Sequence, residues 1–129
     1  MKNRLAFDIK PRTLFLIDGM GALISAFLLG VVLVHFEFFF GIPQKVLYLL
    51  ASIPLFFALY DLVCYIWAVK RLALLLRLIA FANISYCILS IIMAFVHRNS
   101  ISIWGWAYIL GEIVIVLLLA KIELQAANN

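Results

Sequence analysis

Five polar side chains inside long apolar stretches are the residues of this chain that could do chemistry: Asp18, Asp61, Arg77, Asn83 and Glu112. A charged group at the centre of a membrane helix costs roughly 2.5–3.5 kcal/mol or more, so such groups mark ion pathways, proton relays or ion pairs. Asparagine in a membrane helix more often joins two helices by hydrogen bonds. The set is therefore a candidate intramembrane polar site that handles protons, and we expect no catalytic residue.

The charged members of this set are expected to share one level of the membrane. Counted from the helix ends on the side of the chain termini, Asp18, Asp61 and Arg77 lie about five or six residues in, and Glu112 about eight. A rise of about 1.5 Å per residue then places them within roughly 5 Å of one another in depth. Asn83 is expected to lie deeper, near the midplane. The prediction is a polar layer to which each helix contributes one charged group.

Three carboxyl groups and one guanidinium would leave this layer with two surplus negative charges, which a low-dielectric interior does not tolerate. We expect Asp18 or Asp61 to pair with Arg77. At least one carboxyl, with Glu112 the first candidate, should hold a proton at neutral pH. Arg77 is equally expected to extend to the headgroups, as long basic side chains do near helix ends. Glu112 is expected beside one of three polar side chains of the third span: Asn83, Ser85 or Tyr86.

The elements that carry these residues are predicted to be membrane-spanning helices. The chain has 129 residues, of which 68% are hydrophobic and 12% charged, whereas soluble domains are about half apolar and a quarter charged. This composition excludes a soluble globular domain, a disordered tail and a nucleic-acid-binding protein. About 20 apolar residues cross a bilayer as a helix, and runs of that length lie at about 13–34, 46–67, 72–96 and 101–120. We therefore predict an all-α integral membrane four-helix bundle, with residues 1–129 as a single transmembrane domain.

The distribution of lysine and arginine predicts the orientation of the bundle. With four spans, the two termini and the loop between the second and third spans share one side. The other side has only Lys45 and Arg98. Because basic residues concentrate in cytoplasmic segments, both termini are expected in the cytoplasm, with the protein in a bacterial inner membrane. The basic residues on the side of the termini are Lys2, Arg4, Lys10, Arg12, Lys70, Arg71, Arg77 and Lys121.

Small and aromatic residues are expected to pack and anchor the helices. Ala22, Ala26 and Gly30 recur every fourth residue on the face of the first span that carries Asp18. Stripes of small residues let membrane helices approach closely, and aromatic rings favour the headgroup region. The expected interface anchors are Phe38, Phe39, Phe40, Tyr65, Trp67, Trp104 and Trp106.

Residues that could indicate metal or redox chemistry are few. Cys64 and Cys87 should lie some 15 Å apart in depth, beyond the ~7 Å reach of a disulfide. His35 and His97 do not provide the three or four converging ligands that a metal site requires. We expect no metal site, no cofactor and no enzymatic activity.

The segment 10–23, KPRTLFLIDGMGAL, resembles the start of short, uncharacterised four-span bacterial membrane proteins. The resemblance covers this stretch and the overall length of the chain. It implies no activity.

Three functions remain open from the sequence, all of them with the lipid bilayer as a partner. The first is a non-catalytic structural or accessory module that forms a homo-oligomer or supports a complex with another membrane protein. The second is a small proton-linked transporter or channel that uses the buried carboxylates. The third is a protein that binds a lipid or a quinone. Neutralising Asp61 or Glu112 separates the first two, since only the second predicts a pH-dependent activity.

Overall fold

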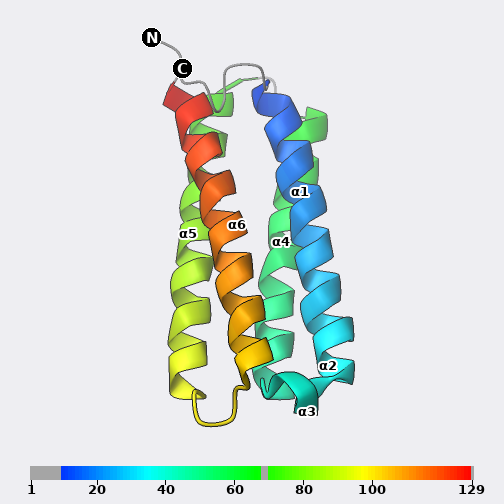
Figure 1. Ribbon diagram of the computed structural model, residues 1–129. Coiled ribbons are helices and arrows are strands. Elements are labelled where there is room, and N and C mark those ends of the chain that lie inside the picture. The colour runs from blue at the N-terminus through cyan, green and yellow to red at the C-terminus, as the bar shows by residue number, and fades with distance from the viewer. Residues whose placement is uncertain (1–9, 68–69, 129) are drawn as a thin grey trace.

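The computed structural model describes residues 10–67 and 70–128, and every regular element in these ranges is helical. The chain forms four long helical rods. Figure 1 shows that they lie side by side, and that the first rod begins at the end of the bundle where the last rod ends. The all-α four-helix bundle predicted from the apolar runs is confirmed. In chain order the elements are α1 (Pro11–Phe27), η1 (Leu28–Val32), α2 (Leu33–His35), α3 (Glu37–Phe40), α4 (Gln44–Trp67), α5 (Leu72–Val96) and α6 (Ile103–Asn128).

Each of the four rods is long and apolar enough to cross a bilayer. The first, Pro11–His35, joins α1, η1 and α2, and the others are α4, α5 and α6; their lengths are 24–26 residues and their mean hydropathy is 2.0–2.2. Large apolar side chains such as Phe56, Phe95 and Ile115 point outward and are 60–70% exposed. These are the features of a small multi-pass membrane protein. The last helix extends to Asn128, beyond the span expected at 101–120, because no glycine or proline interrupts the segment after Ala120.

The four rods form two close pairs, because α1 packs along α4 and α5 packs along α6 (Figure 1). Small residues allow the first pair to approach: a Cβ atom at Gly30 would lie 3.3 Å from the Ala51 Cβ on α4. Ala26 is also buried, whereas Ala22 lines a cavity described below. The two pairs touch each other less extensively than the members of a pair do.

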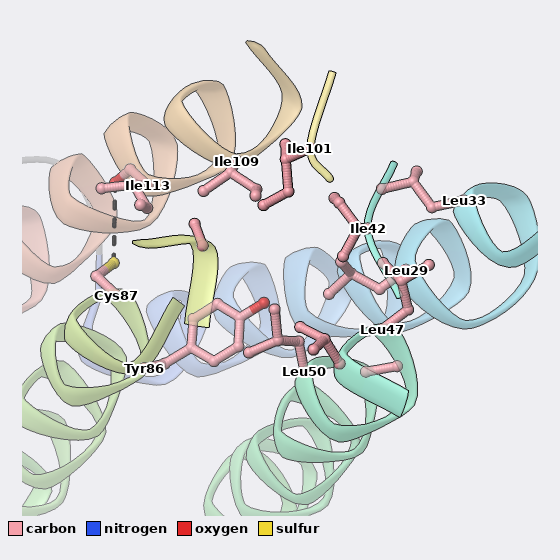
Figure 2. Packing of buried hydrophobic residues seen from close by; sticks show 13 residues of the cluster. Leu29, Leu33, Ile42, Leu47, Leu50, Tyr86, Cys87, Ile101, Ile109 and Ile113 are labelled. Carbon is pink, nitrogen blue, oxygen red and sulfur yellow. Dashed lines mark hydrogen bonds between the residues drawn. The ribbon is translucent and has the colours of Figure 1, made fainter. Parts of the chain in front are cut away.

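Two apolar clusters fill the interior at different heights. Figure 2 shows the larger one, in which Leu29, Leu47 and Ile109 are buried between helices near the loop that joins α5 to α6. The smaller one lies toward the end where α1 begins and contains Phe15 and Leu76. The free thiols Cys64 and Cys87 are buried in these clusters, and Cys87 lies 3.9 Å from the Ile113 carbonyl oxygen (Figure 2).

The two helix pairs are joined at one end by an interloop contact, formed by Phe39–Gly41 and Ser100–Gly105. The Ser102 hydroxyl donates to the carbonyl oxygens of Phe39 (2.7 Å) and Phe40 (3.0 Å), and the Ser100 hydroxyl donates to that of Gly41 (2.9 Å). Gly41 has a left-handed backbone, with φ of 76°. A Cβ atom at Gly105 would overlap the Phe40 carbonyl oxygen. The contact therefore requires glycine at both positions.

Several aromatic residues lie at or near the ends of the long helices. Phe38 and Trp67 are 98% and 72% exposed, and Trp104 stacks on Phe39 with the ring centroids 5.7 Å apart. The remaining expected anchors, Phe40, Tyr65 and Trp106, are partly buried. In a bilayer, exposed aromatic rings at helix ends favour the headgroup region.

Candidate functional site

A cluster of four polar side chains lies in the interior, one from each long helix, and we call it the acid–amide cluster: Asp18, Asp61, Asn83 and Glu123. Their exposed fractions are 3%, 0%, 5% and 0% in that order. The Asn83 amide on α5 donates to Asp18 Oδ1 on α1 at 2.8 Å and to Glu123 Oε1 on α6 at 3.3 Å. Asp61 on α4 lies close to both Asp18 and Glu123. One amide thus bridges helices of both pairs and donates to two of the three carboxyl groups.

The acid–amide cluster forms a polar layer between the two apolar clusters. On each long helix the cluster residue falls between buried members of the one apolar cluster and buried members of the other. A Cβ atom at Gly19 would lie 3.2 Å from the Asp61 Cβ, so the small residue beside Asp18 lets α4 bring its carboxyl against α1. Because Gly19 has no side chain at this point of the α1–α4 contact, the two helices approach closely and Asp61 is fully buried.

Several oxygens of the cluster have no hydrogen-bond donor among the described residues. They are both oxygens of Asp61, Oδ2 of Asp18 and Oε2 of Glu123. A buried carboxylate oxygen without a donor costs free energy, whereas a protonated carboxyl can itself donate to a neighbouring oxygen. These oxygens can therefore accept protons, or hydrogen bonds from a donor that is not part of the described chain.

The structure places Arg77 away from this layer, so the expected pairing of Arg77 with Asp18 or Asp61 is not formed. Its guanidinium donates to the Asn128 side-chain oxygen at 2.9 Å and to the Ala127 carbonyl oxygen at 3.4 Å. Side chains on a helix lean toward its amino terminus, and for α5 that direction leads to the carboxyl end of α6. A cation at the carboxyl end of a helix is favourable, and the extended Arg77 was the alternative expectation.

Replacing Arg77 with glutamine is therefore expected to change stability little. Partly exposed interactions of this kind contribute about 1 kcal/mol or less. Thermal unfolding of the purified protein in detergent should show a melting temperature close to that of the wild type. A loss on the scale of about 3–5 kcal/mol, which is typical of breaking a buried ion pair, would contradict the position of Arg77 described here.

Glu112 belongs to a separate polar site with two tyrosines. The Tyr86 hydroxyl on α5 donates to Glu112 Oε1 at 3.0 Å, and the Tyr108 hydroxyl on α6 lies 3.4 Å from Glu112 Oε2. Ser25 on α1 also lies near Glu112. Tyr86 is one of the three neighbours expected for Glu112. The site is distinct from the layer because Glu112 and Glu123 lie eleven residues, or roughly 16 Å, apart along α6.

A cavity of about 450 Å³ lies between α1 and α6 and connects the two polar sites. Asp18 and Asn83 line it at one level, and Tyr86, Tyr108 and Glu112 line it at the other. The cavity arises because the helix pairs meet loosely and because α1 and α6 both present glycine to it. Gly21 and Gly111 line the cavity, and a Cβ atom on either would meet nothing within 4 Å.

Backbone irregularities border the same cavity. Leu28, the first residue of the π-helical segment η1, lines it, and so does Pro54 of α4. Proline has no backbone N–H, so the helical hydrogen bond to the Leu50 carbonyl is missing. Such interruptions of membrane helices are tolerated where the backbone faces protein or a cavity, and π segments are frequent at functional sites.

A smaller cavity of about 320 Å³ lies on the other side of α1, between α1 and α4. Asp61 and Gly19 line it together with apolar side chains. The acid–amide cluster therefore lies between two cavities, with Asp18 on the wall of the larger and Asp61 on the wall of the smaller. No group of three potential metal ligands with suitable geometry occurs in residues 10–67 and 70–128.

Glu123 is fully buried, although it was not predicted from the sequence as a site residue. The fourth span was expected to end at Ala120, so Glu123 was counted outside it. Helical phase could have found it, because a separation of eleven residues places Glu123 on nearly the same face of α6 as Glu112. Lys121, two residues earlier, lies on another face and is exposed.

Comparison of the chain with protein-family models, with curated proteins and with solved structures found no match.

Proposed function

We propose that the protein is a small proton-linked transporter or channel, in which the acid–amide cluster takes up and releases protons. The observation that carries this proposal is the position of Asp18. It belongs to a layer of three buried carboxyl groups, and the same residue also lines the larger cavity. Its Oδ2 is buried and has no hydrogen-bond partner among the described residues. The cavity gives this layer a route by which protons can be taken up and released, which a closed contact between helices would not provide.

Charge favours protons as the partners of the layer. Three ionised carboxylates around one amide would place three negative charges in a medium of low dielectric constant, and each uncompensated ion costs several kcal/mol there. Bound protons remove this charge and turn unpartnered oxygens into donors. When a molecule or ion enters or leaves the cavity next to Asp18, the number of protons that the layer holds would then change.

Proteoliposomes with a trapped pH-sensitive dye test this proposal. Under an imposed pH gradient and potential, we expect the wild type to move protons faster than empty vesicles. The double variant Asp61→Asn, Glu123→Gln should fall to the rate of empty vesicles, while Glu37→Gln, which changes an acid outside the bundle interior, should not. Equal rates for the wild type and the double variant, or for the wild type and empty vesicles, would refute the proposal.

The hydrogen bonds of Asn83 favour a second candidate, a non-catalytic structural or accessory module. These bonds join helices of both pairs and define their register, which is the property that such a module needs to oligomerise or to support a larger membrane complex. In this case the wild type moves no protons. The double variant would instead fail to assemble, which size-exclusion chromatography with light scattering detects.

We further propose that both termini lie in the cytoplasm of a bacterial cell and that the protein resides in the inner membrane. Support comes from the sequence, in which eight of the ten lysine and arginine residues fall in segments expected on the side of the termini and two in segments expected on the other side. Alkaline phosphatase, which is active only outside the cytoplasm, should be inactive when fused after Asn129. It should be active when inserted between Arg98 and Asn99. The reverse pattern would refute this orientation.

A further inference from the structure

The larger cavity reaches the outer surface of the bundle, on the side that faces lipid. Its rim includes Gly21 and Ile24 of α1 and Gly111 and Ile115 of α6, all of which are exposed. Its floor includes the buried residue Pro54 of α4, together with the polar side chains described above. A molecule dissolved in the bilayer can therefore enter laterally between α1 and α6.

The chemistry of the walls restricts what such a molecule would be. Most of the lining is aliphatic or aromatic, which suits an apolar body. Among the described residues that line the cavity, Asp18 and Glu112 are the ionisable acids and none is lysine, arginine or histidine. Both acids are more than nine-tenths buried, and Oδ2 of Asp18 has no donor. The cavity is apolar in its body and acidic at two points.

Glu112 is the point at which a positive charge would be held. Two tyrosine hydroxyls hydrogen-bond to its two oxygens, so a negative charge on this carboxylate is already stabilised by donors. The rings of Tyr86, Tyr108 and Phe57 also line the cavity, and aromatic faces attract organic cations. Carboxylate and rings together form a site for a cation whose charge is spread over an apolar group.

We infer that the cavity between α1 and α6 binds a hydrophobic organic cation, which enters from the lipid and places its charge beside Glu112, with Asp18 as the second acidic contact. This inference deepens the proposed function and depends on it for the exchange step, in which the arriving cation replaces a proton on the carboxyls. An apolar anion would be repelled by the same groups. A bare metal cation would require several converging oxygen ligands, and the described residues provide no such group.

Two probes of the same shape and opposite charge test the inference. Tetraphenylphosphonium is the cation and tetraphenylborate the anion, and each is titrated into the wild type in lipid nanodiscs by calorimetry, with empty nanodiscs as the blank. We expect saturable binding of the cation only, with affinity that falls as the pH is lowered, because protons compete for the same carboxyls. Glu112→Gln should weaken cation binding by at least about tenfold, and Glu37→Gln should leave it unchanged.

A second variant keeps the test decisive if Glu112→Gln fails to fold. Gly111→Leu places a side chain into the open space at the rim without changing any acid, and we expect it to block cation binding. Equal binding of both probes, as a neutral lipid or quinone site would give, overturns the inference, and so does no binding of either. If the cation does not bind but proton flux still depends on Asp61 and Glu123, the ligand class is wrong while the proposed function stands.

Discussion

Replacing Gly105 with alanine is expected to destabilise the bundle by about 3 kcal/mol or more. The added Cβ atom would overlap the Phe40 carbonyl oxygen and lie 2.8 Å from Ile101 Cγ2. The start of α6 would have to move away from the loop before α4, and forced overpacking of this kind costs about 1–3 kcal/mol. The movement would also weaken the hydrogen bonds from Ser102 to Phe39 and Phe40, each a contribution of about 1 kcal/mol. Thermal unfolding in detergent measures the effect as a lower melting temperature.

Gly111→Ala is the matched control, since it makes the same change on the same helix. A Cβ atom there meets nothing within 4 Å, and alanine is a better helix former than glycine by up to about 1 kcal/mol. We expect the melting temperature of this variant to equal or exceed that of the wild type. If Gly105→Ala proves as stable as Gly111→Ala, the interloop contact does not hold the helix pairs together as described.

Replacing Asn83 with aspartate is expected to have the largest effect on the interior. The change is nearly isosteric, but it removes the amide that donates to Asp18 and Glu123 and adds a fourth carboxyl to three buried ones. Loss of a donor to a buried charged group costs about 1–3 kcal/mol, and a further uncompensated buried charge costs several more. We expect a loss of more than about 3 kcal/mol at neutral pH, or failure to accumulate as folded protein. Denaturation in mixed micelles measures it, and the loss should shrink as the pH is lowered, because protonation removes the charge.

Asn128→Asp provides the matched control for this substitution. Asn128 is exposed at the end of α6 and accepts a hydrogen bond from Arg77 through its side-chain oxygen. Aspartate keeps this acceptor and adds an opposite charge next to the guanidinium, so stability should stay the same or rise slightly. A tolerated Asn83→Asp would show that the carboxyl groups around position 83 are neither as dry nor as close as the structure indicates.

The sequence predicts the bundle well because its apolar runs leave no alternative. Runs of about 20 apolar residues with short polar breaks require helices in a membrane, since a helix satisfies its own backbone hydrogen bonds. Helical phase and depth also predict that Asp18 and Asp61 face inward at the same level, and the structure brings them together. Asn83 lies with them and not deeper, because its amide reaches across to Asp18.

The parts of the site that could not be predicted depend on where α6 ends. The depth of Glu112 was counted from Ala120, whereas the helix continues to Asn128. Glu112 therefore lies about eight residues, or roughly 12 Å, deeper than expected and joins Tyr86 instead of the shared layer. Glu123 takes its place in the layer. The residues around Lys121 do not indicate whether α6 ends or continues there, because a charged residue on one face of a helix does not have to end the helix.

The cavity depends on packing between elements far apart in the chain. It exists because α1 pairs with α4 and α6 pairs with α5, which leaves the glycine-bearing faces of α1 and α6 opposite each other. The stripe of Ala22, Ala26 and Gly30 predicts a close approach on one side of α1. It does not tell which helix approaches, or that Gly21 of α1 faces open space.

The proposed function requires that the carboxyl groups of the acid–amide cluster hold protons inside the membrane and exchange them. Infrared difference spectroscopy of the protein in lipid nanodiscs, recorded as the pH is changed, observes the carbonyl stretching band of protonated carboxyl groups directly. We predict such a band near neutral pH, with intensity that changes with pH and drops in the double variant Asp61→Asn, Glu123→Gln but not in Glu37→Gln. A spectrum without this band at neutral pH, or a band unaffected by the double variant, would contradict the claim.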